Sequence, residues 1–228
     1  MMKHVVFLFG LLFCFEFAWS QSKERKEELQ GKKSSALAYL RLASDLVNYG
    51  YTQQSALPLI NALQIMNEYP MRPLNEKKEG VTVDTTNTEG KNGMISLDYD
   101  RILADAKEFA DGDNTLLELI KKIETERQKE HRGAVGGPLC HTDAVDGNST
   151  DIYQINFIAK YLAEIVVSGD GDTDLDLYVY DSNGNLIASD TDYTDDCYVS
   201  WIPKWTGRFI VKIVNRGPLY NKYVLLTN

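Results

Sequence analysis

The residues best suited to chemistry in this sequence are aspartates on and around a predicted strand at residues 175–180. Nine aspartates and no lysine or arginine lie between Ile165 and Pro203. Calcium takes about six to eight oxygen ligands, which closely spaced carboxylates on loops can supply. We therefore hypothesise a calcium site, the one cofactor that the sequence suggests, formed by Asp170, Asp172, Asp174, Asp176, Asp190 and Asp192.

A solvated sheet face is the alternative interpretation of these aspartates. Asp170, Asp172 and Asp174 have the spacing that opens an EF-hand loop, but the glycine and the bidentate glutamate that complete such a loop are missing. Alternating charges along a strand also prevent sheets from pairing edge to edge. The residues by themselves leave both interpretations open.

Aromatic residues form the second group of candidates in the same region. Exposed aromatic side chains on a rigid scaffold can hold carbohydrate or protein ligands. The predicted ligand-binding residues are Tyr178, Tyr180, Tyr193 and Trp205, whereas Trp201, which lies among apolar neighbours, is expected to fill the core.

Catalytic groups are scarce. His131 and His141 belong to no HExxH pair, and no Gly-x-Ser-x-Gly elbow is present. Cys140 and His141 would point to opposite faces of a strand. The sequence therefore predicts a non-catalytic protein, with a secreted hydrolase whose site lies between two domains as the alternative.

Residues 1–20 have the pattern of a signal peptide. Lys3 precedes an apolar run from Val5 to Phe15, and Ala18 and Ser20 are the small residues of a cleavage site. We expect cleavage near Ser20 and a secreted or periplasmic mature chain without a transmembrane segment. The net charge of −9 argues against nucleic acid as a partner and leaves an extracellular protein or polysaccharide.

Export also bears on the cysteines. Cys140 and Cys197 follow the predicted signal peptide, and an oxidising compartment favours a disulfide between them. The alternative is two separately buried thiols.

Helical periodicity dominates residues 35–130, after a charged arm at 21–34. The first predicted helix begins at Ser35 and ends with Gly50 as its C-cap, and the second begins near Ser55 and stops before Pro70. A long loop is predicted at 71–95. Ser96 then caps a third helix, and a fourth runs from Thr115 to about Glu130.

Beyond a predicted linker at 131–138, the pattern becomes the alternation of strands. The predicted strands lie at 152–157, 161–167, 175–180, 197–202, 209–213 and 220–226. We expect an α+β chain of two domains, in which a small helical N-terminal domain precedes an antiparallel jelly-roll-like β-sandwich at 139–228.

Four blocks in this second part resemble the bacterial pre-peptidase C-terminal (PPC) domain family. They are Asp151-Ile152-Tyr153, the stretch from Gly171 to Asp181 with Asn183-Gly184, the stretch from Gly207 to Ile213, and Tyr223-Val224-Leu225. Ala159-Lys160 stands where the family usually has a glycine. The resemblance implies a jelly-roll-like sandwich that attaches to polymeric substrates or supports the secretion and stability of exported proteins.

Overall fold

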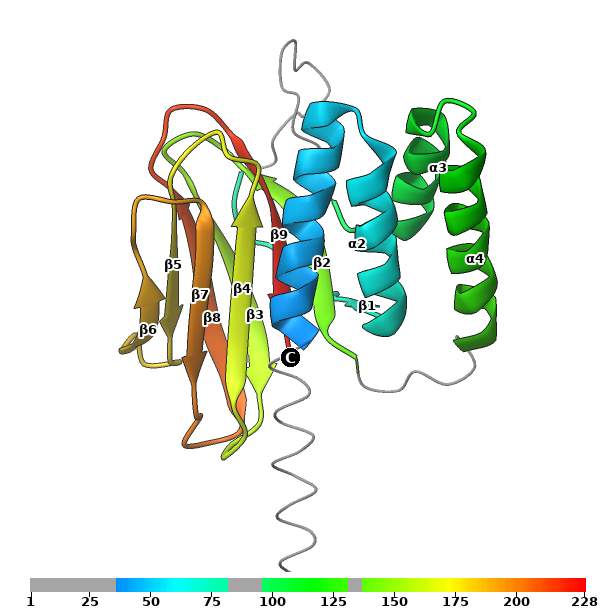
Figure 1. The fold of residues 1–228 in the computed structure, drawn as a ribbon. Coiled ribbons are helices and arrows are strands. Elements are labelled where there is room, and N and C mark those ends of the chain that lie inside the picture. The colour runs from blue at the N-terminus through cyan, green and yellow to red at the C-terminus, as the bar shows by residue number, and fades with distance from the viewer. Residues whose placement is uncertain (1–35, 82–95, 131–136) are drawn as a thin grey trace, which may run out of the picture.

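The computed structural model describes residues 36–81, 96–130 and 137–228 (Figure 1). The predicted signal peptide (1–20), the charged arm (21–34), residues 82–95 of the long loop and residues 131–136 of the linker lie outside the described residues. Within the described ranges, no helix is both long and apolar enough to cross a membrane.

The chain has the predicted α+β fold, with helices first and an antiparallel sandwich after them. The helices are residues 36–53, α2 (Ala56–Glu68), α3 (Tyr99–Phe109) and α4 (Asn114–Glu130). The strands are β1 (Arg72–Pro73), β2 (Leu139–Val145), β3 (Thr150–Phe157), β4 (Ala163–Gly169), β5 (Leu175–Tyr180), β6 (Leu186–Asp190), β7 (Asp196–Trp201), β8 (Gly207–Asn215) and β9 (Asn221–Thr227).

The strand order is that of a jelly roll. One sheet has the order β1-β2-β9-β4-β7 and the other has the order β3-β8-β5-β6, so that sequence neighbours fall in different sheets except for the pairs β1-β2 and β5-β6. All pairings are antiparallel except that of β1 with β2. Strands β1, β2 and β6 are additions to the six strands that the sequence predicts.

Alternation of side chains builds the core between the sheets. Leu175, Leu177 and Val179 of β5 are fully buried, and they lie opposite alternate residues of β8 such as Val211 and Ile213. Since successive residues of a strand point to opposite faces, the residues between them form the outer face of the four-stranded sheet.

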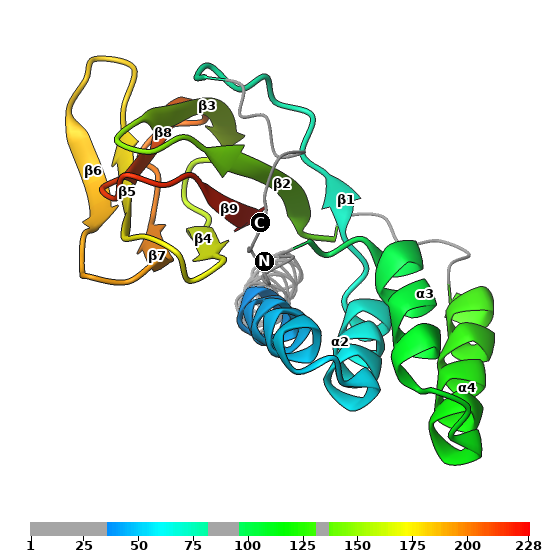
Figure 2. The same ribbon diagram turned by 90° about the horizontal axis from the view of Figure 1, so that it is seen from above.

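The helices pack on the outer face of the five-stranded sheet. Cys140, Leu226 and Val166 lie opposite one another across β2, β9 and β4. These residues and Val224 join the hydrophobic cluster of the helices. Figure 2 shows the helix of residues 36–53 beside this sheet, with α2, α3 and α4 progressively further from it. The helical part and the sandwich are therefore joined by packing as well as by sequence.

Gly50 has a different role from the predicted C-cap. The helix continues through it to residue 53, and Gln54 takes the left-handed conformation with φ of 48°. A side chain at Gly50 would meet Leu59 Cδ2 at 2.6 Å, so the glycine permits α2 to approach closely. Asp98 rather than Ser96 caps α3, because its side chain accepts from Asp100 N and Arg101 N.

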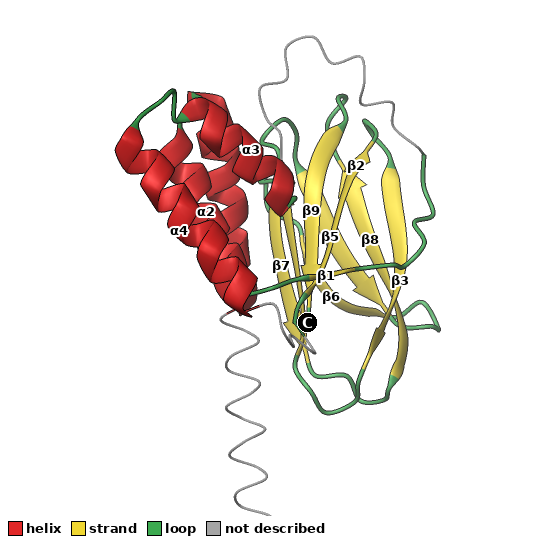
Figure 3. Ribbon diagram, turned by 90° about the vertical axis from the view of Figure 1, so that its right-hand side faces the viewer, coloured by secondary structure: helices red, strands yellow, loops and turns green. Residues whose placement is uncertain are grey.

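The described first part of the predicted long loop pairs with both sheets of the sandwich. Residues 72–81, which we call the strap, pair with β2 through β1 and then with β3 through a bridge between Glu79 and Ile152. Leu74 of the strap is buried in the sandwich core. Figure 3 shows the strap crossing from β1 to the β3 side, so it joins the edges of the two sheets.

Candidate functional site

The outer face of the four-stranded sheet brings two of the predicted ligand-binding tyrosines together. Tyr178 and Tyr180 lie on β5, directly opposite Lys212 and Ile210 of β8. Lys212 and Ile210 lie in turn opposite Ile152 and Gln154 of β3. We call this surface the tyrosine face and define it by Ile152, Gln154, Asn156, Asp176, Tyr178, Tyr180, Ser189, Arg208, Ile210, Lys212, Val214 and Arg216.

The two tyrosine rings form a strip along β5. Their centroids are 6.3 Å apart and their planes differ by 23°. Lys212 Nζ lies 5.0 Å from the centroid of the Tyr180 ring, close enough for a cation–π interaction. Both rings are partly exposed, so a ligand can reach them.

Arg216 fixes the position of Tyr178. Its Nε donates to Asp176 Oδ2 at 2.6 Å and its Nη2 donates to the Tyr178 hydroxyl at 3.0 Å. Burial and the hydrogen bond to Asp176 raise the pKa of Tyr178, so the hydroxyl stays protonated. Arg208, Lys212 and Arg216 were not among the predicted site residues, although the alternation along 207–215 places 208, 210 and 212 on one face.

The other two predicted aromatic residues lie elsewhere. Tyr193, in the loop between β6 and β7, is 97% exposed. Trp205 is 39% exposed and stacks on the core residue Phe209 with ring centroids 5.6 Å apart. Trp201 contacts Phe157 edge to face, with centroids 4.7 Å apart, in agreement with its predicted core role.

The predicted calcium-binding aspartates are held by separate donors. Asp176 Oδ2 accepts from Arg216, Asp190 Oδ2 accepts from Tyr198 N at 2.8 Å, and Asp192 Oδ1 accepts from Thr194 N at 2.9 Å.

Asp170 and Asp174 differ from one another in their surroundings. Asp170 Oδ2 accepts from Lys222 N at 3.2 Å. Asp174 Oδ1 is buried without a hydrogen bond, and burial followed by the charge of Asp176 raises its pKa. Within the described residues, no three His, Cys, Asp or Glu side chains are placed to hold one metal ion. Calcium binding stays a prediction.

The predicted disulfide is wrong, because both cysteines are free thiols. Cys140 is on β2 and Cys197 on β7, with β9 and β4 between them. Three strand spacings separate these strands by about 14 Å, beyond the reach of a disulfide. Cys140 packs with the helices, whereas Cys197 packs in the sandwich core and donates to the Leu175 carbonyl at 3.1 Å.

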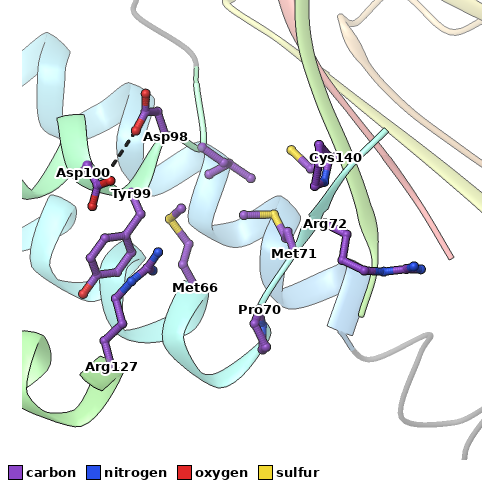
Figure 4. A pocket seen from close by; sticks show the side chains of 11 residues that line it. Met66, Pro70, Met71, Arg72, Asp98, Tyr99, Asp100, Arg127 and Cys140 are labelled. Carbon is purple, nitrogen blue, oxygen red and sulfur yellow. Dashed lines mark hydrogen bonds between the residues drawn. The ribbon is translucent and has the colours of Figure 1, made fainter. Parts of the chain in front are cut away.

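A pocket of about 320 Å³ lies between the helices and the five-stranded sheet (Figure 4). Tyr99 and Arg127 line its helical side, with the guanidinium carbon 3.4 Å from the ring centroid, and Met71 and Cys140 line its sheet side. No histidine is among the described lining residues, and burial raises the pKa of Cys140 to about 12. The pocket thus lacks an activated nucleophile among these residues.

A polar cluster lies beneath the strap, where β2, β3 and β9 meet. It consists of Lys78, His141, Asp143, Asp151, Tyr153 and Tyr223. Lys78 Nζ donates to Asp143 Oδ1 at 2.8 Å and lies 3.3 Å from Asp151 Oδ2. The Tyr223 hydroxyl donates to the same Asp151 oxygen at 2.8 Å. The cluster fastens the strap to both sheets.

Lys160, which stands where PPC domains usually have a glycine, has a backbone conformation typical of glycine. Lys160 has a φ of 66°, which is the left-handed region that glycine adopts most readily. The turn between β3 and β4 therefore keeps this conformation with a lysine in place.

No protein-family model matches the sequence, and no curated protein matches it either. Several solved structures are similar over the sandwich. The PPC domain of a collagenase from Bacillus anthracis has 14% identity and a TM-score of 0.34, over 41% of this chain and 91% of its own.

Two further structures are similar over comparable lengths. The Yersinia pseudotuberculosis-derived mitogen has 15% identity and a TM-score of 0.29, over 41% of this chain and 86% of its own. A carbohydrate-binding module of Cellvibrio mixtus lichenase 5A, in complex with cellotriose, has 12% identity and a TM-score of 0.24, over 43% of this chain and 81% of its own. These proteins have different stated roles, and likenesses of this degree assign none of them to the chain.

Proposed function

We propose that this protein is an exported, non-catalytic binding module that attaches to a polysaccharide through the tyrosine face. The observation that carries the proposal is the strip formed by Tyr178 and Tyr180, 6.3 Å apart and nearly parallel, on an open sheet face. Sugar rings stack on aromatic rings through their C–H faces, and a strip of two rings offers adjacent positions for two sugars.

The surroundings of the strip support this proposal. Arg216 and Lys212 hold the two tyrosines through their contacts with Tyr178 and Tyr180, so little conformational freedom is lost when a ligand binds. Ser189 lies beside the strip on β6 and Gln154 lies one strand beyond β8, and both offer hydrogen bonds to sugar hydroxyls. Among the described residues, the helices pack on the opposite sheet and not on this one (Figure 2).

Affinity electrophoresis of the mature chain in gels that contain polysaccharides tests the proposal. The panel contains neutral and acidic polymers, and collagen and fibronectin serve as protein ligands in a parallel pull-down. We expect retardation by at least one polysaccharide, and Tyr180→Ala lowers that affinity by about tenfold or more, as a central aromatic contact does.

Tyr193→Ala is the matched control, because Tyr193 is almost fully exposed and lies outside the tyrosine face. Thermal melts of both variants establish that they are folded. Retention by no polysaccharide, or equal retention of wild type and Tyr180→Ala, would count against the proposal. Binding to the protein ligands alone would replace it with a protein-binding role.

A further inference from the structure

We infer that the ligand of the tyrosine face is an anionic polysaccharide. This inference rests on the proposed function and names the class of polymer that the same site takes. Its basis is the placement of basic residues, which the acidic composition of the chain does not suggest.

Basic residues are few in the sandwich and are concentrated on this one face. Within residues 137–228 they are Lys160, Lys204, Arg208, Lys212, Arg216 and Lys222, against thirteen aspartates and glutamates. Half of them, Arg208, Lys212 and Arg216, lie on the tyrosine face. The face is therefore positive in an otherwise acidic sandwich.

Two of these three cations keep their charge available to a ligand. Lys212 rests over Tyr180, and Arg208 donates to the neutral Gln154 at 3.0 Å. Among the described residues, neither forms an ion pair with a carboxylate. Arg216 does pair with Asp176, but half of its side chain is exposed.

Three carboxylates lie near the face: Asp174, whose charge acts on Asp176 and Arg216, and two that accept hydrogen bonds from residues of the face, Asp176 and Glu79. Asp176 is 5% exposed and lies beneath Arg216. Glu79 lies at the edge of the face on the strap, where its Oε1 accepts from Gln154 Nε2 at 3.1 Å. Neither Asp176 nor Glu79 lies between Lys212 and the Tyr180 ring. The ammonium group of Lys212 therefore attracts a negatively charged group of a ligand that lies above Tyr180.

The spacing of the cations suits an extended polymer. Arg208 and Lys212 are four residues apart on β8, which corresponds to about 13 Å between their backbone positions, and Arg216 follows the strand and reaches back to Tyr178. A polysaccharide with acidic groups at intervals can stack on the tyrosines and meet these cations in turn. Nucleic acid carries a denser negative charge, and the acidic surface of the rest of this protein repels it, since the net charge of the chain is −9.

The test compares polymers that share a backbone and differ in charge. Polygalacturonate is paired with the same polymer after methyl esterification of its carboxylates, and carboxymethyl-cellulose is paired with hydroxyethyl-cellulose. We expect the acidic member of at least one pair to bind about tenfold more tightly at low salt. That preference falls as NaCl is raised to 0.5 M, because salt screens exposed charges.

Lys212→Gln removes one charge from the face and Lys222→Gln removes one from the other sheet, so the two variants have equal net charge. Lys212→Gln weakens binding of the acidic polymer by about threefold to tenfold and binding of the neutral polymer by clearly less, because only the acidic polymer also loses the charge interaction, whereas Lys222→Gln changes neither. Melting curves verify that both are folded.

Equal affinity for the acidic and neutral polymers, or equal effects of the two lysine variants, would overturn the inference while leaving the proposed function in place. Tighter binding to single-stranded DNA than to any polysaccharide would also overturn it. A chain that binds no polysaccharide removes the proposed function and the inference together.

Discussion

Lys78 on the strap donates to Asp143 of β2 at 2.8 Å, although the two residues are 65 positions apart in the sequence. The lysine side chain is 14% exposed and also lies 3.3 Å from Asp151, which is almost completely buried. One cation thus serves two carboxylates at the junction of the sheets. This contact explains why a segment rich in charged residues lies on the sandwich.

Lys78→Met should lower the free energy of unfolding by about 2 to 3 kcal/mol. The substitution leaves Asp151 buried without its cation, and the cost is below that of a fully buried pair because Asp143 is partly exposed. Urea unfolding measures the loss. Lys77→Met is the control, since Lys77 is exposed and should change stability by no more than about 0.5 kcal/mol. Equal losses in both variants would contradict the assigned role of Lys78.

The contribution of Asp143 to stability should depend on pH. Burial alone would raise its pKa, but hydrogen bonds from His141 and Lys78 outweigh burial and hold the pKa below its usual range. A folded pKa below the unfolded value of about 3.9 means that the contribution is fully present above pH ~4 and is lost as the pH falls.

Asp143→Asn should therefore be less stable than wild type by about 1 to 2 kcal/mol at pH 7. The difference should shrink at pH 2.5, because Asp143 of the unfolded wild-type chain is then protonated while the folded carboxylate, with its lowered pKa, still carries its charge. Urea unfolding at the two pH values measures it, and a difference that is constant or grows on acidification would exclude this account.

Cys140 and Cys197 should react slowly with a thiol reagent in the folded protein. Cys197 is buried and Cys140 is partly buried, and burial raises the pKa of each thiol, to about 12 for Cys140. Without residues 1–20, the chain should release two equivalents with Ellman's reagent in 6 M guanidinium chloride and almost none in buffer. Treatment with dithiothreitol should leave the melting temperature unchanged. A mass 2 Da lower under non-reducing conditions would show a disulfide.

Removal of calcium should have little effect on folding. The carboxylates of Asp176, Asp190 and Asp192 accept hydrogen bonds from three separate parts of the chain, and no shared ligand set is present among the described residues. We expect the melting midpoint to agree within about 1 °C in chelator and in millimolar calcium. A ligand that binds only the folded state raises the midpoint, so a rise of several degrees in calcium would support the metal hypothesis.

Local patterns allowed the elements themselves to be predicted. Alternation identified β5 with its observed bounds, Leu175–Tyr180, and helical spacing identified α2 close to its observed start at Ala56. Such patterns depend on residues a few positions apart, whose facing is fixed by the periods of strand and helix. The same alternation puts Tyr178 and Tyr180, which the sequence analysis named as candidates, on one face.

Contacts between distant segments required the tertiary structure. Arg216 reaches Tyr178 across 38 positions because β8 pairs with β5, and Cys140 is kept from Cys197 because β9 and β4 lie between their strands. The order of strands depends on the packing of all side chains together, which no local pattern contains. The sequence by itself determined the helices, most strands and the tyrosine strip. The tertiary structure decided which cations surround that strip, how the strap closes the sandwich and that the two thiols stay apart.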